Sequence, residues 1–190
     1  MVEAIAKPRD ISDDAKSTHV AVLATRSVWR VRGWCTSKNW TAALASWQSV
    51  TWPMEVGTTI GDRTRVLCVG RLDWLVVSDN RVAEEQMSLL APSLEGCLVT
   101  VADLSAGTAS VKISGCNARE ALSVLCGLDL HPSSFRVGQC ARTRLAQLPV
   151  TIDCLSELSF DCYFSQSFEK YFLLSLEEVL AGFGYPVISK

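Results

Sequence analysis

The sequence predicts an α+β domain with mixed, mostly antiparallel sheets and split β-α-β units. Three observations favour this class. Strand-like segments outnumber helix-like ones, the helix-like segments fall between pairs of strands, and residues 103–132 carry a complete local pattern of strand, turn and helix.

The strand-turn-helix unit is predicted from its local pattern. Residues 108–114 alternate, which places Val111 and Ile113 on one buried face. Asn117 is a favourable helix N-cap, and Gly127 predicts a left-handed helix stop. The helix between them has one apolar face, formed by Ala118, Ala121, Leu122 and Leu125.

The segments upstream are predicted in chain order. Short strands are expected at 19–23, 28–32, 65–69, 74–77 and 98–102. Residues 70–73 are expected to form a four-residue hairpin loop. Tryptophan, alanine and leucine at helical spacing predict an amphipathic helix over 38–48, and a second helix is expected between Asp79 or Asn80 and Pro92. Residues 1–18 are expected to form a polar tail.

After Pro132, strands are expected at 141–145, 150–154 and 158–164. A last helix is expected to begin with Ser167 as its cap. It carries a broad apolar stripe made of Phe168, Tyr171, Phe172, Leu176, Val179, Leu180 and Phe183. We therefore predict one α+β domain over 19–190, with a candidate division into sub-halves at about 19–100 and 101–190.

Composition narrows the class of function. Hydrophobic residues make up 48% of the 190 residues and the formal net charge is −2. The mean hydropathy of +0.21 indicates surface that a partner covers. No basic block favours nucleic acid, and no apolar run approaches the ~18 residues of a membrane span. The first residues lack an apolar signal core, so we expect a cytoplasmic protein.

The eight cysteines do not have metal-ligand spacing. No Cys-x-x-Cys pair occurs, and His19 and His131 lie far from any paired spacing. Several cysteines, among them Cys68, Cys97, Cys154 and Cys162, fall inside apolar patterns. We expect small buried side chains with free thiols, and no metal-binding residue in this chain.

Tryptophan is concentrated near the N-terminus. Five of the six tryptophans precede residue 53: Trp29, Trp34, Trp40, Trp47 and Trp52. They form either a satellite core or a docking surface, because tryptophan is enriched at interface hot spots. A base-stacking platform is a third alternative, but it has little basic interleaving. The candidate interface residues are these tryptophans together with Phe168, Tyr171 and Phe172 of the last helix.

Motifs for chemistry are absent from the sequence, which has no dinucleotide fingerprint, phosphate loop or nucleophile elbow. His131 with Asp129 forms either a base and its orienting group or a helix exit. Asp103 either contacts a pterin or accepts backbone N–H groups in a buried turn. Arg142 and Arg144 alternate on one strand, where they either pair with partner carboxylates or form a solvated face. No catalytic residue is predicted.

Four segments in order carry a family resemblance. They are residues 65–77, 103–132, 135–145 and 160–172. The second is similar to the folate-binding domain of the glycine cleavage T protein (aminomethyltransferase) superfamily. The four together resemble the gamma subunit family of heterotetrameric sarcosine oxidase. Two positions depart from that pattern, with Gly70-Arg71 in place of Gly-Pro and Gln166-Ser167 in place of Arg-Ser.

The resemblance implies a fold similar to that folate-binding domain and a structural subunit without catalytic or cofactor-binding residues. The implied partners are a large flavin-, NAD- and folate-binding subunit, an FAD-binding subunit and a small zinc subunit. FAD, FMN, NAD, tetrahydrofolate and zinc are expected in those subunits. The implied complex demethylates sarcosine oxidatively and transfers one carbon to tetrahydrofolate. The alternatives are a free-standing folate-binding or one-carbon transferase-like protein, or the matching subunit of an N-methyl amino acid dehydrogenase.

Overall fold

The computed structural model describes residues 18–23, 26–34, 52–79 and 98–182. The first sheet has five strands in the order β3-β4-β5-β2-β6. Their bounds are Thr59–Gly61, Thr64–Gly70, Asp73–Ser78, Ser27–Trp34 and Leu98–Asp103. The second sheet has the order β1-β7-β10-β9-β8. Its strands span Thr18–Val22, Thr108–Gly115, Ser159–Ser165, Leu148–Ser156 and Cys140–Leu145.

The neighbouring strands of both sheets pair antiparallel. Strands β7 and β9 consequently run parallel to each other on either side of β10, and helix α3 (Ala118–Leu125) lies in the connection between them. That connection also contains strand β8, which pairs antiparallel with β9. In the first sheet, β5 and β6 run parallel to each other on either side of β2, which is the strand arrangement of a split β-α-β unit. The predicted fold class is thereby confirmed.

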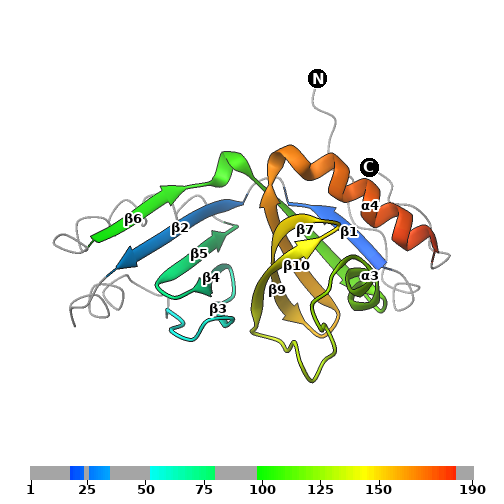
Figure 1. Cartoon of the computed structure of the whole chain (residues 1–190), viewed down its shortest axis with the longest axis horizontal. Helices are drawn as coiled ribbons and strands as arrows, with labels where there is room; N and C mark the ends of the chain where they lie inside the picture. The colour runs from blue at the N-terminus through cyan, green and yellow to red at the C-terminus, as the bar shows by residue number, and fades with distance from the viewer. Residues whose placement is uncertain (1–17, 24–25, 35–51, 80–97, 183–190) are drawn as a thin grey trace.

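The layers follow one another across the molecule (Figure 1). The first sheet lies at the left of that view and the second at the right, followed by α3 and helix α4 (Glu169–Gly182). Strand β1 comes from the start of the described chain, yet it pairs with β7 in the second sheet. Among the described residues, neither α-helix is long and apolar enough to cross a lipid bilayer.

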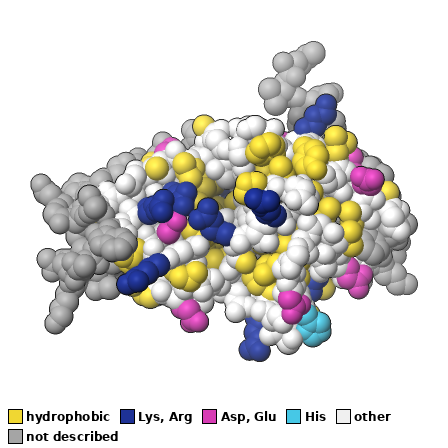
Figure 2. All heavy atoms as spheres, viewed as in Figure 1, with side chains coloured by type: hydrophobic (Ala, Val, Ile, Leu, Met, Phe, Trp, Pro, Cys, Tyr) yellow, Lys and Arg dark blue, Asp and Glu magenta, His cyan; other side chains and the backbone are white. Residues whose placement is uncertain are grey.

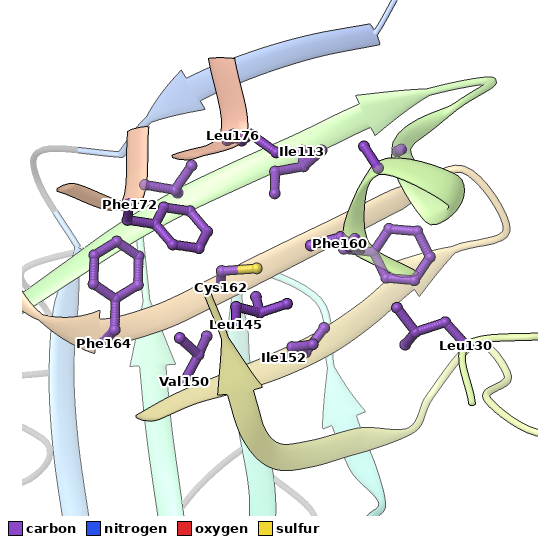
Figure 3. Packing of buried hydrophobic residues seen from close by; sticks show 14 of the residues in the cluster. Ile113, Leu130, Leu145, Val150, Ile152, Phe160, Cys162, Phe164, Phe172 and Leu176 are labelled. Carbon is purple, nitrogen blue, oxygen red and sulfur yellow. The ribbon is translucent and has the colours of Figure 1, made fainter. Parts of the chain in front are cut away.

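The main core lies between the second sheet and the two helices (Figure 3). Phe160, Cys162 and Phe164 of β10 point toward the helices because alternate residues of a strand share a face. Phe172 of α4 packs on Phe164 with 4.4 Å between ring centroids, and Leu176 lies one turn further along the same helix face. Burial of such side chains contributes roughly 1.5–3 kcal/mol each.

The first sheet has two apolar faces. Val31, Trp74 and Val76 share the outer face, where Trp52 meets Trp74 edge-on with 5.6 Å between ring centroids. The opposite face joins the second sheet through a mixed cluster: Val28, Leu67, Leu75, Val77, Cys140 and Tyr163. The two faces alternate along the strands, and the central strands β4 and β5 carry buried apolar residues on both of them.

The bounds of the predicted strands are confirmed to within two residues. The predicted hairpin loop after β4 and the predicted start of the last helix are wrong. The hairpin after β4 is tighter than expected, because Gly70 pairs with Asp73 and leaves Arg71 and Leu72 as the turn. Leu72 adopts a φ of 56°, in the left-handed region that tight turns require. Helix α4 begins at Glu169 rather than beside Ser167, since Gln166–Phe168 forms a 3-10 turn first.

The ends of α3 also differ from prediction. Asn117 occupies the N-cap position, but its side chain makes no capping hydrogen bond with the helix. The helix does not end in a left-handed glycine. Cys126 is already extended, with a φ of −133°, because it forms an isolated bridge to Leu145. Tertiary pairing therefore replaces the local stop signal.

Three predictions lie outside the described residues. They are the helix over 38–48, the helix between 79–80 and 92, and the polar tail apart from Thr18, which begins β1.

Candidate functional site

A charged layer lies between the two sheets. Arg65 of β4 spans the junction and donates from Nε and Nη2 to both carboxylate oxygens of Asp153 of β9, at 2.6 and 2.9 Å. The Asp153 side chain is fully buried and that of Arg65 is 15% exposed. Arg65 also donates to the carbonyl of Gly61 at 2.8 Å. This bidentate pair joins positions 88 residues apart.

A second pair lies on the neighbouring strand. Arg26, just before β2, donates from Nη1 to Asp161 Oδ2 and, at 3.0 Å, to the hydroxyl of Tyr163. Its Nε donates to the exposed Asp79 at 2.7 Å. Asp161 is fully buried, and its Oδ1 accepts no hydrogen bond from the described part of the chain. Asp153 and Asp161 oppose each other across β9 and β10, so each carboxylate is neutralised from the other sheet.

Electrostatics distinguish these groups from exposed acids. Burial raises the pKa of the Asp153 carboxyl above its usual value, against the opposing effect of Arg65. Burial likewise raises the pKa of Tyr163 well above that of a free phenol. Each buried acid contacts an arginine that comes from the other sheet, and Arg26 also reaches the exposed Asp79. The layer therefore joins the two sheets.

Sequence reasoning missed this layer. Asp153 lies between Ile152 and Cys154, and Asp161 between Phe160 and Cys162. An acid between two buried apolar neighbours on a strand faces away from their core. That pattern is the signal for a second buried face, but the arginine partners are not identifiable without the tertiary structure.

The predicted tryptophan surface is only partly described. Trp52 is 8% exposed and belongs to the outer core of the first sheet. Trp29 is half-buried against the same cluster, and its Nε1 has no hydrogen-bond partner in the described segments. The side chain of Trp34, and Trp40 and Trp47 entirely, lie outside the described residues. The structure thus favours the satellite-core alternative for Trp52.

The last helix separates its aromatic residues. Phe172 is fully buried in the main core, which favours a core role for this ring over the predicted partner contact. Phe168 and Tyr171 are 41% and 51% exposed, and Leu174 is 54% exposed. Leu174 was missed by the sequence analysis, although residues spaced three apart form a ridge on a helix. Phe168 is the last residue of the 3-10 turn that leads into α4, and Tyr171 and Leu174 lie in α4 itself. We call these three exposed residues the α4 ridge; a partner role for it stays a prediction.

The described cysteines are free thiols, as expected. Cys68, Cys140, Cys154 and Cys162 are buried. Burial raises the pKa of Cys140 to about 12, so its thiol stays protonated at neutral pH. Cys97 lies outside the described residues.

The loop acids act locally. The exposed Asp129 accepts the backbone N–H of His131 at 2.9 Å, while His131 Nδ1 pairs with Ser133 Oγ at 2.7 Å. The helix-exit alternative is therefore confirmed. Asp103 accepts the backbone N–H of Ser105 at 2.8 Å, which confirms the turn alternative, although Asp103 is exposed rather than buried.

Arg142 and Arg144 occupy exposed positions of β8. Arg142 lies 3.7 Å from Asp73 of the first sheet. Figure 2 shows Lys and Arg side chains gathered over the middle of one face.

Known proteins share both the sequence pattern and the fold. A family profile described as "Sarcosine oxidase, gamma subunit family" matches residues 32–182. The sarcosine oxidase subunit gamma of Corynebacterium sp. (strain U-96) is 37% identical over 117 residues, which are 58% of this chain and 54% of that relative. The chain therefore spans about half the length of that relative. The subunit gamma of Arthrobacter sp. is 30% identical over 152 residues, 78% of this chain and 73% of that relative.

Solved structures agree. A chain of the heterotetrameric sarcosine oxidase from Corynebacterium sp. U-96, in complex with pyrrole 2-carboxylate, superposes with a TM-score of 0.82 and 26% identity, covering 92% of this chain and 89% of that chain. The glycine cleavage system aminomethyltransferase T from Bartonella henselae shares the fold with a TM-score of 0.63 and 13% identity, covering 86% of this chain and 46% of that chain. From these matches and the observed fold, the chain belongs to the sarcosine oxidase gamma subunit family.

Proposed function

We propose that this chain is a non-catalytic assembly subunit of a flavin-dependent heterotetrameric sarcosine oxidase. The observation that carries the proposal is the superposition with a chain of such an enzyme over 92% of this chain and 89% of that chain. The proposed complex demethylates sarcosine to glycine and transfers one carbon to tetrahydrofolate. FAD, FMN, NAD, tetrahydrofolate and zinc are proposed to reside in the other subunits.

The chemistry of the described residues supports a structural role. The buried carboxylates Asp153 and Asp161 are each matched by an arginine of the opposite sheet. Buried acids in catalytic sites instead face a substrate-accessible space. The exposed α4 ridge supports contact with a partner subunit, because exposed aromatic side chains are common anchors at interfaces.

The test is co-expression of the tagged full chain with the oxidase subunits encoded beside it. Native mass spectrometry and the visible spectrum of the purified material are the readouts. We expect a yellow complex that contains this chain, two large subunits and one small subunit. A colourless, lone chain of 20.8 kDa contradicts the proposal.

A second candidate is a free-standing folate-binding or one-carbon transferase-like protein, favoured by the fold shared with aminomethyltransferase T. Titration with tetrahydrofolate, followed by quenching of tryptophan fluorescence, distinguishes it. Saturable quenching by the isolated chain supports this candidate and its absence removes it. If the yellow complex forms but oxidises another N-methyl amino acid better than sarcosine, the chain is the matching subunit of a related dehydrogenase.

A further inference from the structure

An arginine cluster lies at the rim where the two sheets meet. Arg30 and Arg32 of β2 point to the same face as Asp73, and Arg142 of β8 approaches from the second sheet. Arg144 lies two residues further along β8, on the same strand face as Arg142. We call these four arginines the rim cluster.

One carboxylate cannot satisfy this cluster. Arg30 occupies both oxygens of Asp73, with Nε to Oδ1 at 2.9 Å and Nη2 to Oδ2 at 2.6 Å. Arg32 Nε and Arg142 Nη1 lie 4.0 and 3.7 Å from Oδ2, beyond hydrogen-bond distance. Among the described residues, the guanidinium groups of Arg32 and Arg142 thus have no carboxylate within hydrogen-bond distance, and their side chains are 69% and 55% exposed.

Arg144 adds to this surplus, because within the described segments no salt bridge neutralises it. Three arginines of the cluster lie within 4.0 Å of the Asp73 carboxylate and Arg144 adds a fourth positive charge on β8, whereas the whole chain has a net charge of −2. Although the chain as a whole is acidic, the positive charge gathered at this surface favours an acidic partner there. Figure 2 shows the gathered Lys and Arg side chains as dark blue spheres with an acidic side chain among them.

The geometry favours carboxylates as the ligand. The guanidinium fork matches a carboxylate with two parallel hydrogen bonds, and it stays charged at any physiological pH. The arginines project from strands of two sheets that the buried pairs hold together, so the cluster is preorganised. Nucleic acid fits less well, since the cluster is small and the net charge of the chain is negative.

We infer that the rim cluster docks an acidic segment, rich in Asp and Glu, of a partner subunit. The inference rests on the proposed function, and it specifies the chemistry of one contact between this chain and another subunit of the proposed complex. The partner's carboxylates occupy the donors that Asp73 leaves unfilled on Arg32, Arg142 and Arg144. Arg30 stays paired with Asp73 and is not a contact for the partner in this proposal.

The test compares the full chain with a charge-reversal variant, R32E/R142E/R144E, in the co-expressed complex. Arg30 is kept so that its ion pair with Asp73 stays intact. R136E is the matched control, because Arg136 is an exposed arginine on the loop before β8 that donates to the carbonyl of Ser133. The fraction of chain in the complex is measured by native mass spectrometry and analytical gel filtration at 50 and 500 mM salt, with circular dichroism as a check on folding.

We expect the triple variant to assemble at least tenfold less well at 50 mM salt, and R136E to match the wild type. The wild-type complex should weaken as salt rises. A folded triple variant that assembles like the wild type would falsify the inference and leave the proposed function standing. Failure of the wild-type chain to assemble with any flavin subunit overturns both. Nucleic acid that co-purifies with the wild type but not with the variant overturns the assignment of an acidic protein partner.

Discussion

At the scale of single residues, charge is the most organised feature of this chain. Asp153 and Asp161 are fully buried, and each contacts an arginine from the other sheet. Buried ion pairs contribute little net stability, but the loss of one partner is costly because the other charge stays buried. These two ion pairs therefore favour one arrangement of the two sheets over others.

The pair of Arg65 and Asp153 gives the first prediction. The variant D153N leaves a guanidinium at 15% exposure without its counter-charge, so we expect a loss of about 3–5 kcal/mol in the free energy of unfolding. The apolar double variant R65M/D153L should lose less than the sum of the single variants. Urea unfolding followed by tryptophan fluorescence measures both. The exposed Arg63→Met is the control, expected within about 0.5 kcal/mol of wild type; additive losses would contradict the prediction.

Asp73 gives a prediction about pH. Burial alone raises the pKa of Asp73, but the Arg30 hydrogen bond and the charges of Arg30, Arg32 and Arg142 hold it below its usual value. The unfolded state therefore binds the proton more tightly. The stabilisation is present above the unfolded pKa of roughly 4 and is lost as the pH falls through the lower folded value.

The measurement is the free energy of unfolding at pH 5 and at pH 3 for the wild type and Asp73→Asn. The wild type should lose more stability between these pH values than the variant does. Equal losses in the two proteins would show that Asp73 does not carry this pH dependence.

At the scale of elements, the turns and helix faces depend on one or two residues each. The β3–β4 hairpin turns at Gly61, which has a φ of +111°. A Cβ at this position would lie 2.0 Å from the carbonyl oxygen of Thr64. Helix α4 instead depends on the face that carries Phe172, Leu176 and Leu180. The hairpin also connects to the charged layer, since the carbonyl of Gly61 accepts a hydrogen bond from Arg65.

Gly61→Ala tests the hairpin. We expect a loss on the order of 1–3 kcal/mol or more in the free energy of unfolding, because the left-handed backbone and the close carbonyl both oppose a side chain. Gly107→Ala is the matched control, with no atom within 4 Å of its Cβ, and should be near neutral. The measurement is the thermal unfolding of both variants. Equal melting temperatures for Gly61→Ala and Gly107→Ala would contradict the expectation.

Phe172→Ala tests the core-facing side of α4. Removal of a fully buried ring that packs on Phe164 should cost about 3–5 kcal/mol. Tyr171→Ala changes the adjacent exposed residue and should cost within about 0.5 kcal/mol. The difference in urea midpoint between the two variants is the measurement; a large loss with Tyr171→Ala would place that ring in the core as well.

At the scale of the whole molecule, two sheets share an interface that is part apolar and part ionic, with helices on the outer face of the second sheet (Figure 1). This arrangement leaves the α4 ridge and the rim cluster on the surface. Both are built on rigid elements, so their substitution should alter association without altering the fold.

The ridge gives the last prediction. The variant F168S/Y171S should lower the fraction of this chain that enters the oxidase complex by about tenfold, since exposed aromatic anchors carry much of an interface's free energy. Its urea midpoint should match that of the wild type. Leu158→Ser, which changes another exposed apolar residue at 51% exposure, is the control and should assemble normally. Normal assembly of F168S/Y171S would exclude the ridge from the interface.

The sequence by itself determined most strands, the antiparallel class and the family. Alternation on β7 and helical spacing on α3 are local patterns, and they place Val111, Ile113 and Ala121 correctly in the core. Local signals were less reliable at element ends, because the pairing of Cys126 with Leu145 replaced the predicted stop at Gly127.

Only the tertiary structure decided which charged residues meet. Arg65 and Asp153 lie 88 residues apart, and Arg26 and Asp161 lie 135 apart. Neither separation follows a helix or strand period, so no local pattern predicts these contacts. Likewise, Tyr171 and Phe172 are neighbours in sequence, yet one is exposed and the other buried. The physical reason is that the direction in which a helix face points depends on the sheet it packs against.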